Sequence, residues 1–366
     1  MGIEKLSFLP RPLGVKKAAG QPVALGDSQG RVVSKVSSEW TWTDHFGQIR
    51  CRISSLRMRY TVNPGLYAVG EPDRESDVFV TANYKLSFDI LRRELKGLNA
   101  WIIVLDTKGI NVWCAAGKGT FGTDELISRI NEINLHNIVS HRRIIIPQLG
   151  AVGVNGRIVQ QRTGFRVYFG PVHAKDIPAY IRAGYVKTPE MRLVRFNMLD
   201  RLVLTPMEIN PTMKKFPLFG LIVLILFGIQ PSGILFKDAW EGGMPFLIFG
   251  LMSVFIGAFI TPLVLPFIPF RSFAVKGWLT GMISVFALMN GIELSYYKSL
   301  LPVAAAYIFF PLASSYIALQ FTGSTAFTSM SGVKKELKIG VPVYLTATAL
   351  SLLILIMYKL FQWKII

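Results

Sequence analysis

The stretch Asn111-Val-Trp-Cys-Ala-Ala-Gly-Lys118 decides how this chain is interpreted. It follows an apolar run at residues 100–105, which predicts a buried parallel strand, and a set of turn-forming residues at 106–109. Thr123 and the two acidic residues after it predict a helix that ends near residue 135. Cys114 is therefore expected where a strand ends and its crossover begins, and open α/β sheets bind ligands at that edge. The small residues after it would let a flat ligand approach the backbone.

Two common motifs do not fit this stretch. A Walker phosphate loop needs a glycine five residues before Gly-Lys and then Ser or Thr, but the preceding glycine is Gly109 and Gly119 follows Lys118. A thioredoxin-like pair needs Cys-x-x-Cys, and the other cysteine is the distant Cys51. Two cysteines and four scattered histidines also do not predict a zinc or iron–sulfur site. Cys114 is either a reactive thiol, since Lys118 and a helix N-terminus would favour the thiolate, or a small buried hydrophobic residue.

Residues 111–118 match without substitution the cap-helix signature of the mercury-methylating corrinoid proteins, and the chain resembles that family. Those proteins are similar to the corrinoid-binding domain of the corrinoid iron–sulfur protein of the acetyl-CoA pathway. Two further family-like strings lie at residues 80–89 and 321–336, so the resemblance covers roughly residues 45–366. The cysteine at position 114 separates this family from its iron–sulfur relatives, which lack it there.

The resemblance implies a corrinoid cofactor with Cys114 as the axial cobalt ligand. The implied activity is that of a corrinoid-dependent methyltransferase, which moves a methyl group from cysteine-ligated methyl–Co(III) to inorganic Hg(II) and gives methylmercury. One alternative is a membrane-bound corrinoid methyl carrier of one-carbon metabolism with another acceptor, and a second is a binding or scaffold protein without turnover. A methyl group taken up as a cation and released as a carbanion costs two electrons per turn. The implied partners are therefore a ferredoxin-like protein with two [4Fe–4S] clusters and a methyltetrahydrofolate-linked methyl donor.

The expected corrinoid site combines the signature with neighbouring strand ends and loops. Its residues are Asn111, Val112, Trp113, Cys114, Ala115, Ala116, Gly117, Lys118, Thr120, Thr81, Asn83, Gly150 and Gly153. Asn111 and Lys118 could hydrogen-bond the sulfur or balance its charge, and Trp113 could exclude water or serve as a core aromatic. The four histidines (His45, His136, His141 and His173) lack the Asp-x-His-x-x-Gly context of histidine-ligating corrinoid modules and are expected at the surface or in the core.

Composition separates a polar first half from an apolar second half. The 366 residues carry a formal net charge of +18, and the apolar residues concentrate in the last 150 positions. Such a basic balance suits an anionic membrane surface, so no nucleic-acid partner is expected. Two distant cysteines favour a reducing compartment, and residues 1–38 predict no secretory signal. We predict a mobile segment at 1–45, a Rossmann-like parallel α/β corrinoid domain at 46–205, a Pro-marked linker at 206–216, and an all-α transmembrane domain at 217–366.

Five apolar stretches are long enough, or nearly so, to span a bilayer, at 217–236, 244–270, 273–292, 300–320 and 340–361. With the α/β domain inside, the inner loops hold Arg271, Lys276, Lys334, Lys335 and Lys338, whereas the outer loops hold only Lys237 and Lys298. This asymmetry predicts a multi-pass protein of the inner membrane with the corrinoid domain in the cytoplasm and the C-terminus outside. The membrane domain could be a plain anchor. The loop at 322–336 could contact the corrinoid domain or hand on mercury, or be a re-entrant turn in which Ser331, Lys334 and Glu336 open the last helix.

Overall fold

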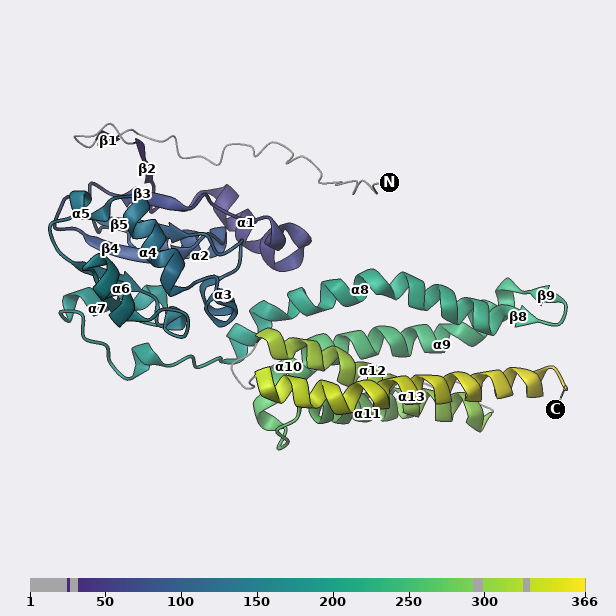
Figure 1. Ribbon diagram of the computed structural model, residues 1–366. Helices are drawn as coiled ribbons and strands as arrows, with labels where there is room; N and C mark the ends of the chain where they lie inside the picture. The colour runs from purple at the N-terminus through teal and green to yellow at the C-terminus, as the bar shows by residue number, and fades with distance from the viewer. Residues whose placement is uncertain (1–24, 27–31, 292–298, 325–329, 366) are drawn as a thin grey trace, which may run out of the picture. The chain divides into compact units, whose positions relative to one another are not determined.

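The computed structural model describes residues 25–26, 32–291, 299–324 and 330–365 (Figure 1). The chain forms two compact units, one of residues 1–51 and 55–193 and one of residues 52–54 and 194–366. Most of the predicted mobile segment lies outside the described residues. Its described part is ordered, because residues 25–26 and 32–36 form strands and helix α1 begins at Trp42.

The first unit is built on one seven-stranded sheet. Its strands are β1 (Leu25–Gly26), β2 (Val32–Val36), β3 (Gly65–Val69), β4 (Asp77–Ala82), β5 (Ala100–Leu105), β6 (Arg143–Ile146) and β7 (Arg166–Phe169), in the order β1-β2-β3-β5-β4-β6-β7. The predicted parallel arrangement holds for β4, β5, β6 and β7, but the sheet as a whole is mixed, because β3 runs antiparallel to β5. The reason is the short connection at residues 70–76, since a parallel return needs a crossover of a dozen or more residues.

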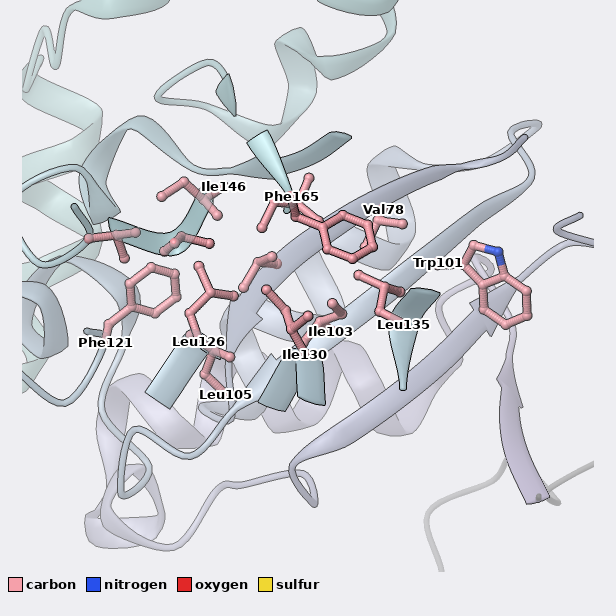
Figure 2. Close-up of a cluster of buried hydrophobic side chains, with 14 of the residues drawn as sticks. Val78, Trp101, Ile103, Leu105, Phe121, Leu126, Ile130, Leu135, Ile146 and Phe165 are labelled. Atoms are coloured by element: carbon pink, nitrogen blue, oxygen red, sulfur yellow. The ribbon is translucent and has the colours of Figure 1, made fainter. Parts of the chain in front are cut away.

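Helices cover both faces of this sheet. They are α1 (Trp42–Ile53), α2 (Lys85–Glu94), α3 (Val112–Lys118), α4 (Thr123–Glu132), α5 (Leu135–Ile138), α6 (Gly156–Thr163) and α7 (Ile177–Arg182). Alternate residues of β5 face opposite sides, so Ile103 and Leu105 pack with Leu126 of α4 while Ile102 packs with Leu91 of α2. Figure 2 shows the first of these two clusters. The central strands are therefore buried on both faces by side chains of these helices.

The second unit contains five helical segments long and apolar enough to cross a membrane, within the described part of the chain. They are α8 (Met198–Gly228), α9 (Phe236–Phe255) with its continuation to residue 267 through a π-helical turn at Ile256–Ile260 and α10 (Thr261–Val264), α11 (Phe273–Gly291), α12 (Leu300–Gln320) and α13 (Met330–Gln362). They lie side by side in Figure 1. The predicted set of five spans is therefore compatible with the structure, and their orientation stays a prediction.

Residues 206–216, predicted as a linker, are helical and lie inside α8. The helix begins far upstream of the expected span, at an Asn197 capping box, and continues through three prolines. Proline is tolerated within long apolar helices whose neighbours satisfy the freed backbone groups. The prolines therefore do not mark a break in this chain.

Glu336 takes a position that the sequence analysis did not foresee. It lies in the second turn of α13, but its carboxylate accepts hydrogen bonds from Ser272 Oγ (2.9 Å) and from the backbone N–H groups of Phe273 (3.2 Å) and Ala274 (2.9 Å). Glu336 thus caps α11 and not its own helix, and it ties the starts of α11 and α13 together. Residues 325–329 of the predicted 322–336 loop lie outside the described residues.

Candidate functional site

Cys114 lies in the first turn of the short helix α3. The Asn111 side chain caps this helix, because its Oδ1 accepts a hydrogen bond from the Cys114 backbone N–H at 2.9 Å. Gly119 ends the helix in the left-handed region, with φ at 81°. The signature at 111–118 therefore contains its own start and stop signals. Between these two caps the chain forms a helix of seven residues.

The two faces of α3 divide the predicted cofactor-binding residues. Val112, Ala115 and Ala116 are buried in the core cluster beneath the helix. Trp113 is 40% exposed, and Cys114 is half-buried next to it. Lys118 is exposed and lies four residues after Cys114, which places the two side chains on the same side of the helix.

Asn83 holds the turn that leads into α3. Its Oδ1 accepts hydrogen bonds from the backbone N–H groups of Thr107 (3.1 Å) and Gly109 (2.9 Å), and its Nδ2 donates to Asp106 Oδ1 at 3.2 Å. The Thr107 hydroxyl lies 2.8 Å from Asn83 Oδ1 and 2.6 Å from the Ile110 carbonyl oxygen, so its single proton is shared between two acceptors. The Asn83 amide, predicted at the corrin edge, is therefore already engaged within the protein.

An ion pair completes this turn. Lys108 donates to the Asp106 carboxylate through both its backbone N–H and its Nζ. The side-chain hydrogen bond from Lys108 is the main cause that lowers the pKa of Asp106. Lys108 itself has a φ of 57°, in the left-handed region that non-glycine residues rarely adopt. The backbone between β5 and α3 is thus fixed by hydrogen bonds on both sides.

A cavity of about 350 Å³ opens at the carboxyl ends of β4, β6 and β7, next to α3. Four predicted site residues line it, namely Thr81, Asn111, Val112 and Trp113. The lining also includes residues that the sequence analysis did not select, among them Ser87, Ile90, Pro147, Gly170 and His173. Pro147 and Gly170 directly follow β6 and β7, so their place after a strand was a signal that could have identified them.

The loop glycines Gly150 and Gly153 pack against α3 and against Phe121 just after it, and Thr120 contacts the helix backbone. A Cβ atom on Gly153 would lie 2.1 Å from the Phe121 carbonyl oxygen and 3.1 Å from Ala116 Cα, and one on Gly150 would lie 2.5 Å from the Phe121 ring. The Thr120 hydroxyl is 3.5 Å from the Ala115 carbonyl oxygen. Glycine is therefore needed at both positions for close packing within the protein itself.

The donor groups near α3 suit a cofactor that brings most of its own ligands. Across the described residues, no three His, Cys, Asp or Glu side chains are grouped so that they could hold a metal ion. His136 stacks on Phe165, and the His141 ring bonds the Ser76 carbonyl oxygen at 3.0 Å, as expected of core or surface histidines. The Cys114 thiol is half-buried and follows the cavity-lining Trp113, although Cys114 itself is not among the lining residues. A thiolate there could serve as a single soft ligand.

Comparison with known proteins finds a family match within the first unit and several partial relatives. Residues 54–181 match the family described as CO dehydrogenase/acetyl-CoA synthase delta subunit. The acetyl-CoA decarbonylase/synthase complex subunit gamma of Methanopyrus kandleri is 30% identical over 144 residues, which is 39% of this chain and 31% of that protein. The corrinoid/iron-sulfur protein large subunit of Moorella thermoacetica is 32% identical over 124 residues, or 33% of this chain and 27% of that protein.

These likenesses support the resemblance to corrinoid proteins, and they cover only part of each protein compared. The chain spans less than a third of the length of these two relatives, and the matched region contains the cavity, the Asn83 turn and α3. The two relatives are named for acetyl-CoA synthesis and for a corrinoid with iron and sulfur, and neither for mercury. The comparisons therefore agree with the one-carbon alternative better than with mercury methylation.

Proposed function

We propose that residues 54–181 bind a corrinoid, that Cys114 is an axial ligand of its cobalt, and that the protein takes part in methyl transfer. The supporting observation is a half-buried thiol on the first turn of α3, a helix whose residues Val112 and Trp113 line a cavity at the carboxyl ends of parallel strands, in the region similar to corrinoid proteins. A bound corrinoid would supply a cobalt centre that can accept and release a methyl group.

The residues of this chain would hold and tune that centre. Ligation requires the thiolate form of Cys114, and the Lys118 cation one helical turn away would favour it. Asn111 fixes the backbone of Cys114, while the exposed Trp113 and the open position of Gly117 form the surface that would face a ring. Thr81 and His173 line the adjoining cavity and would contact other parts of the cofactor.

The acceptor that the comparisons favour belongs to one-carbon metabolism. In this form of the proposal the protein is a membrane-held methyl carrier, supplied by a methyltetrahydrofolate-linked donor. The Methanopyrus kandleri relative is named as a subunit of a complex, and the Moorella thermoacetica relative as the large subunit of a corrinoid/iron-sulfur protein. Both names support a role for protein partners. The two cysteines of this chain are too few for a cluster, so electrons would come from a ferredoxin-like protein with two [4Fe–4S] clusters.

Inorganic Hg(II) is the second candidate acceptor, and one specific observation favours it. The signature at residues 111–118 matches that of the mercury-methylating family at every position and includes the cysteine. In this form the protein is a mercury methyltransferase of the inner membrane. The α/β unit would lie in the cytoplasm and the C-terminus outside, which a C-terminal tag tested for protease access would establish.

The ligand is tested first with the full-length protein in detergent. Wild type, Cys114→Ala and Cys51→Ala are loaded with corrinoid, and cobalt content and visible absorption are measured. We expect equal spectra for wild type and Cys51→Ala, and a shifted spectrum or lost cobalt for Cys114→Ala. An unshifted, fully loaded Cys114→Ala protein would show that the cysteine is not a ligand, and no cobalt in any sample would refute corrinoid binding.

The acceptor is tested next, in membranes that contain the loaded protein, a reductant and an isotopically labelled methyl donor. Labelled methylmercury formed from Hg(II) by wild type but not by Cys114→Ala would support mercury as the acceptor. A labelled protein that gives no methylmercury but transfers its methyl group to an added acetyl-CoA synthase would support the carrier. Equal transfer by wild type and Cys114→Ala would contradict both forms.

A further inference from the structure

A large groove runs along the helical unit between α11, α12 and α13. Its volume is about 1050 Å³, and its apolar wall includes Ala274, Val275, Trp278, Leu312, Ile339 and Val343. The polar groups within the wall are satisfied by one another, because the Ser315 hydroxyl lies 2.8 Å from the Tyr344 hydroxyl and 2.7 Å from the Ala274 carbonyl oxygen. The groove therefore offers an apolar surface to an occupant and few free hydrogen-bonding groups.

The groove has a charged end and an apolar end. Arg271 and Lys335 lie where α11 and α13 begin, and both line the groove. Val343 follows Lys335 by eight positions on the same helix, which corresponds to about 12 Å along its axis. Trp278 lines the groove from α11, beyond the charged end, and tryptophan is common near a membrane interface. An occupant that fits has an anionic head and an apolar tail.

The two cations at the charged end are available to such a head. Within the described ranges, neither Arg271 nor Lys335 forms an ion pair, and Lys335 is exposed. Glu336 also lines the groove, but its carboxylate is engaged by Ser272 and by the first N–H groups of α11. These partners are neutral, so Glu336 keeps its negative charge, and the two cations outnumber it at this end of the groove.

We propose that this groove binds one anionic phospholipid, with its phosphate between Arg271 and Lys335 and an acyl chain along the wall that ends at Val343. The inference rests on the helical unit spanning a membrane and does not depend on the corrinoid. A phospholipid fits better than a soluble phosphate, because a soluble phosphate would leave the apolar wall uncovered. It also fits better than a zwitterionic lipid, whose choline group would place a third cation at this end.

Native mass spectrometry of the delipidated full-length protein tests the proposal. Phosphatidylglycerol and phosphatidylcholine with the same acyl chains are added separately, and the dissociation constant of the first adduct is measured. We expect wild type to prefer phosphatidylglycerol, and the double variant Arg271→Gln/Lys335→Gln to lose about 30-fold in affinity for it, at about 1 kcal/mol per basic side chain. Lys237→Gln, which removes an exposed cation from α9, is the matched control and should change nothing.

A second variant separates the groove from simple charge attraction. Val343→Trp would fill the wall while it keeps both cations, so it should weaken the binding of both lipids. Equal binding of the two lipids by wild type, or an unchanged phosphatidylglycerol affinity in Val343→Trp, would overturn the proposal. A lipid-free dimer that phosphatidylglycerol does not dissociate would also overturn it, by showing that a second copy covers the groove. Arg271→Lys/Lys335→Arg should retain binding, and an unchanged helical circular dichroism spectrum would show that the variants fold.

Discussion

Asn83 and Thr107 join the ends of two neighbouring strands, because Asn83 Oδ1 accepts hydrogen bonds from both the backbone N–H (3.1 Å) and the hydroxyl (2.8 Å) of Thr107. Asn83 directly follows β4 and Thr107 lies two residues after β5, and both are buried. The Thr107 hydroxyl also reaches the carbonyl oxygen of Ile110, the residue before the Asn111 cap. The position of Cys114 therefore depends on the Asn83 amide, which directly follows β4.

Replacement of Asn83 by alanine should loosen this connection. The N–H groups of Thr107 and Gly109 would lose their acceptor, and a buried group left unsatisfied costs about 1–3 kcal/mol. Hydrogen exchange should become faster at residues 107–114 than in β4 itself. The control is Asn99→Ala, which removes an amide that accepts one bond from the Glu71 N–H on an exposed turn. Equal exchange in the two variants would contradict the role of Asn83.

Gly153→Ala should disrupt the packing against α3, whereas Gly117→Ala should not. A Cβ atom at 153 meets backbone atoms of Phe121 and Ala116, which cannot rotate away, so we expect a loss of about 3 kcal/mol or more. No atom of the described chain lies within 4 Å of a Cβ at 117, and alanine favours a helix by up to about 1 kcal/mol over glycine. Denaturant unfolding monitored by circular dichroism checks the pair, and a stable Gly153→Ala protein would refute the contact.

The two cysteines should differ in reactivity. Cys114 is half-buried on α3, whereas Cys51 is 1% exposed and its thiol donates to the Gln48 carbonyl oxygen at 3.2 Å. N-ethylmaleimide should therefore modify one thiol per folded chain and two after denaturation. Mass spectrometry of Cys51→Ala and Cys114→Ala identifies the site. Modification of Cys51 in the folded protein would mean that α1 opens, and no modification of Cys114 would mean that it is a buried hydrophobic residue.

Acid should destabilise the α/β unit through Asp44. Burial alone would raise the pKa of Asp44, but hydrogen bonds from Thr41 and Arg92 outweigh it and hold this pKa well below its usual value. Because the folded pKa is depressed, the stabilisation is present above the unfolded pKa of about 4 and is lost as the pH falls below it. Urea unfolding at pH 7 and at pH 3 measures the loss. Asp44→Asn should reduce the dependence on pH, and Asp124→Asn, at an exposed carboxylate, should leave it as in wild type.

The strands of the α/β unit could be predicted where their side chains are buried on both faces. The apolar runs that became β4, β5 and β6 are continuous for this reason. β3 has no such continuous buried run to predict it, because only its last two residues are buried. Its direction follows from the short connection at residues 70–76, but its partner is β5, which comes later in the chain, and no local pattern records that pairing.

The candidate site could be predicted only in part for a similar reason. Asn111 and Gly119 are local signals, and they bound α3 as caps. The cavity is assembled from the ends of strands far apart in sequence, so His173 lines it without any motif around it. The need for glycine at position 153 is seen only in the folded chain, where a Cβ atom would clash with backbone atoms more than thirty residues earlier in the sequence.

Small residues should decide the packing of α11 on α12, and this gives a last prediction. A Cβ atom on Gly277 would lie 2.6 Å from Ala318 Cβ, and one on Gly281 would lie 2.8 Å from Ser314 Cβ. Glycines four residues apart let two membrane helices approach closely. Gly277→Val and Gly281→Val should each cost about 1–3 kcal/mol, because the helices must separate. Gly291→Val, on the same helix but with no described atom within 4 Å of its Cβ, is the control. Loss of helical circular dichroism in a titration with sodium dodecyl sulfate measures the effect, and equal midpoints for the three variants would mean that the α11–α12 contact does not limit stability.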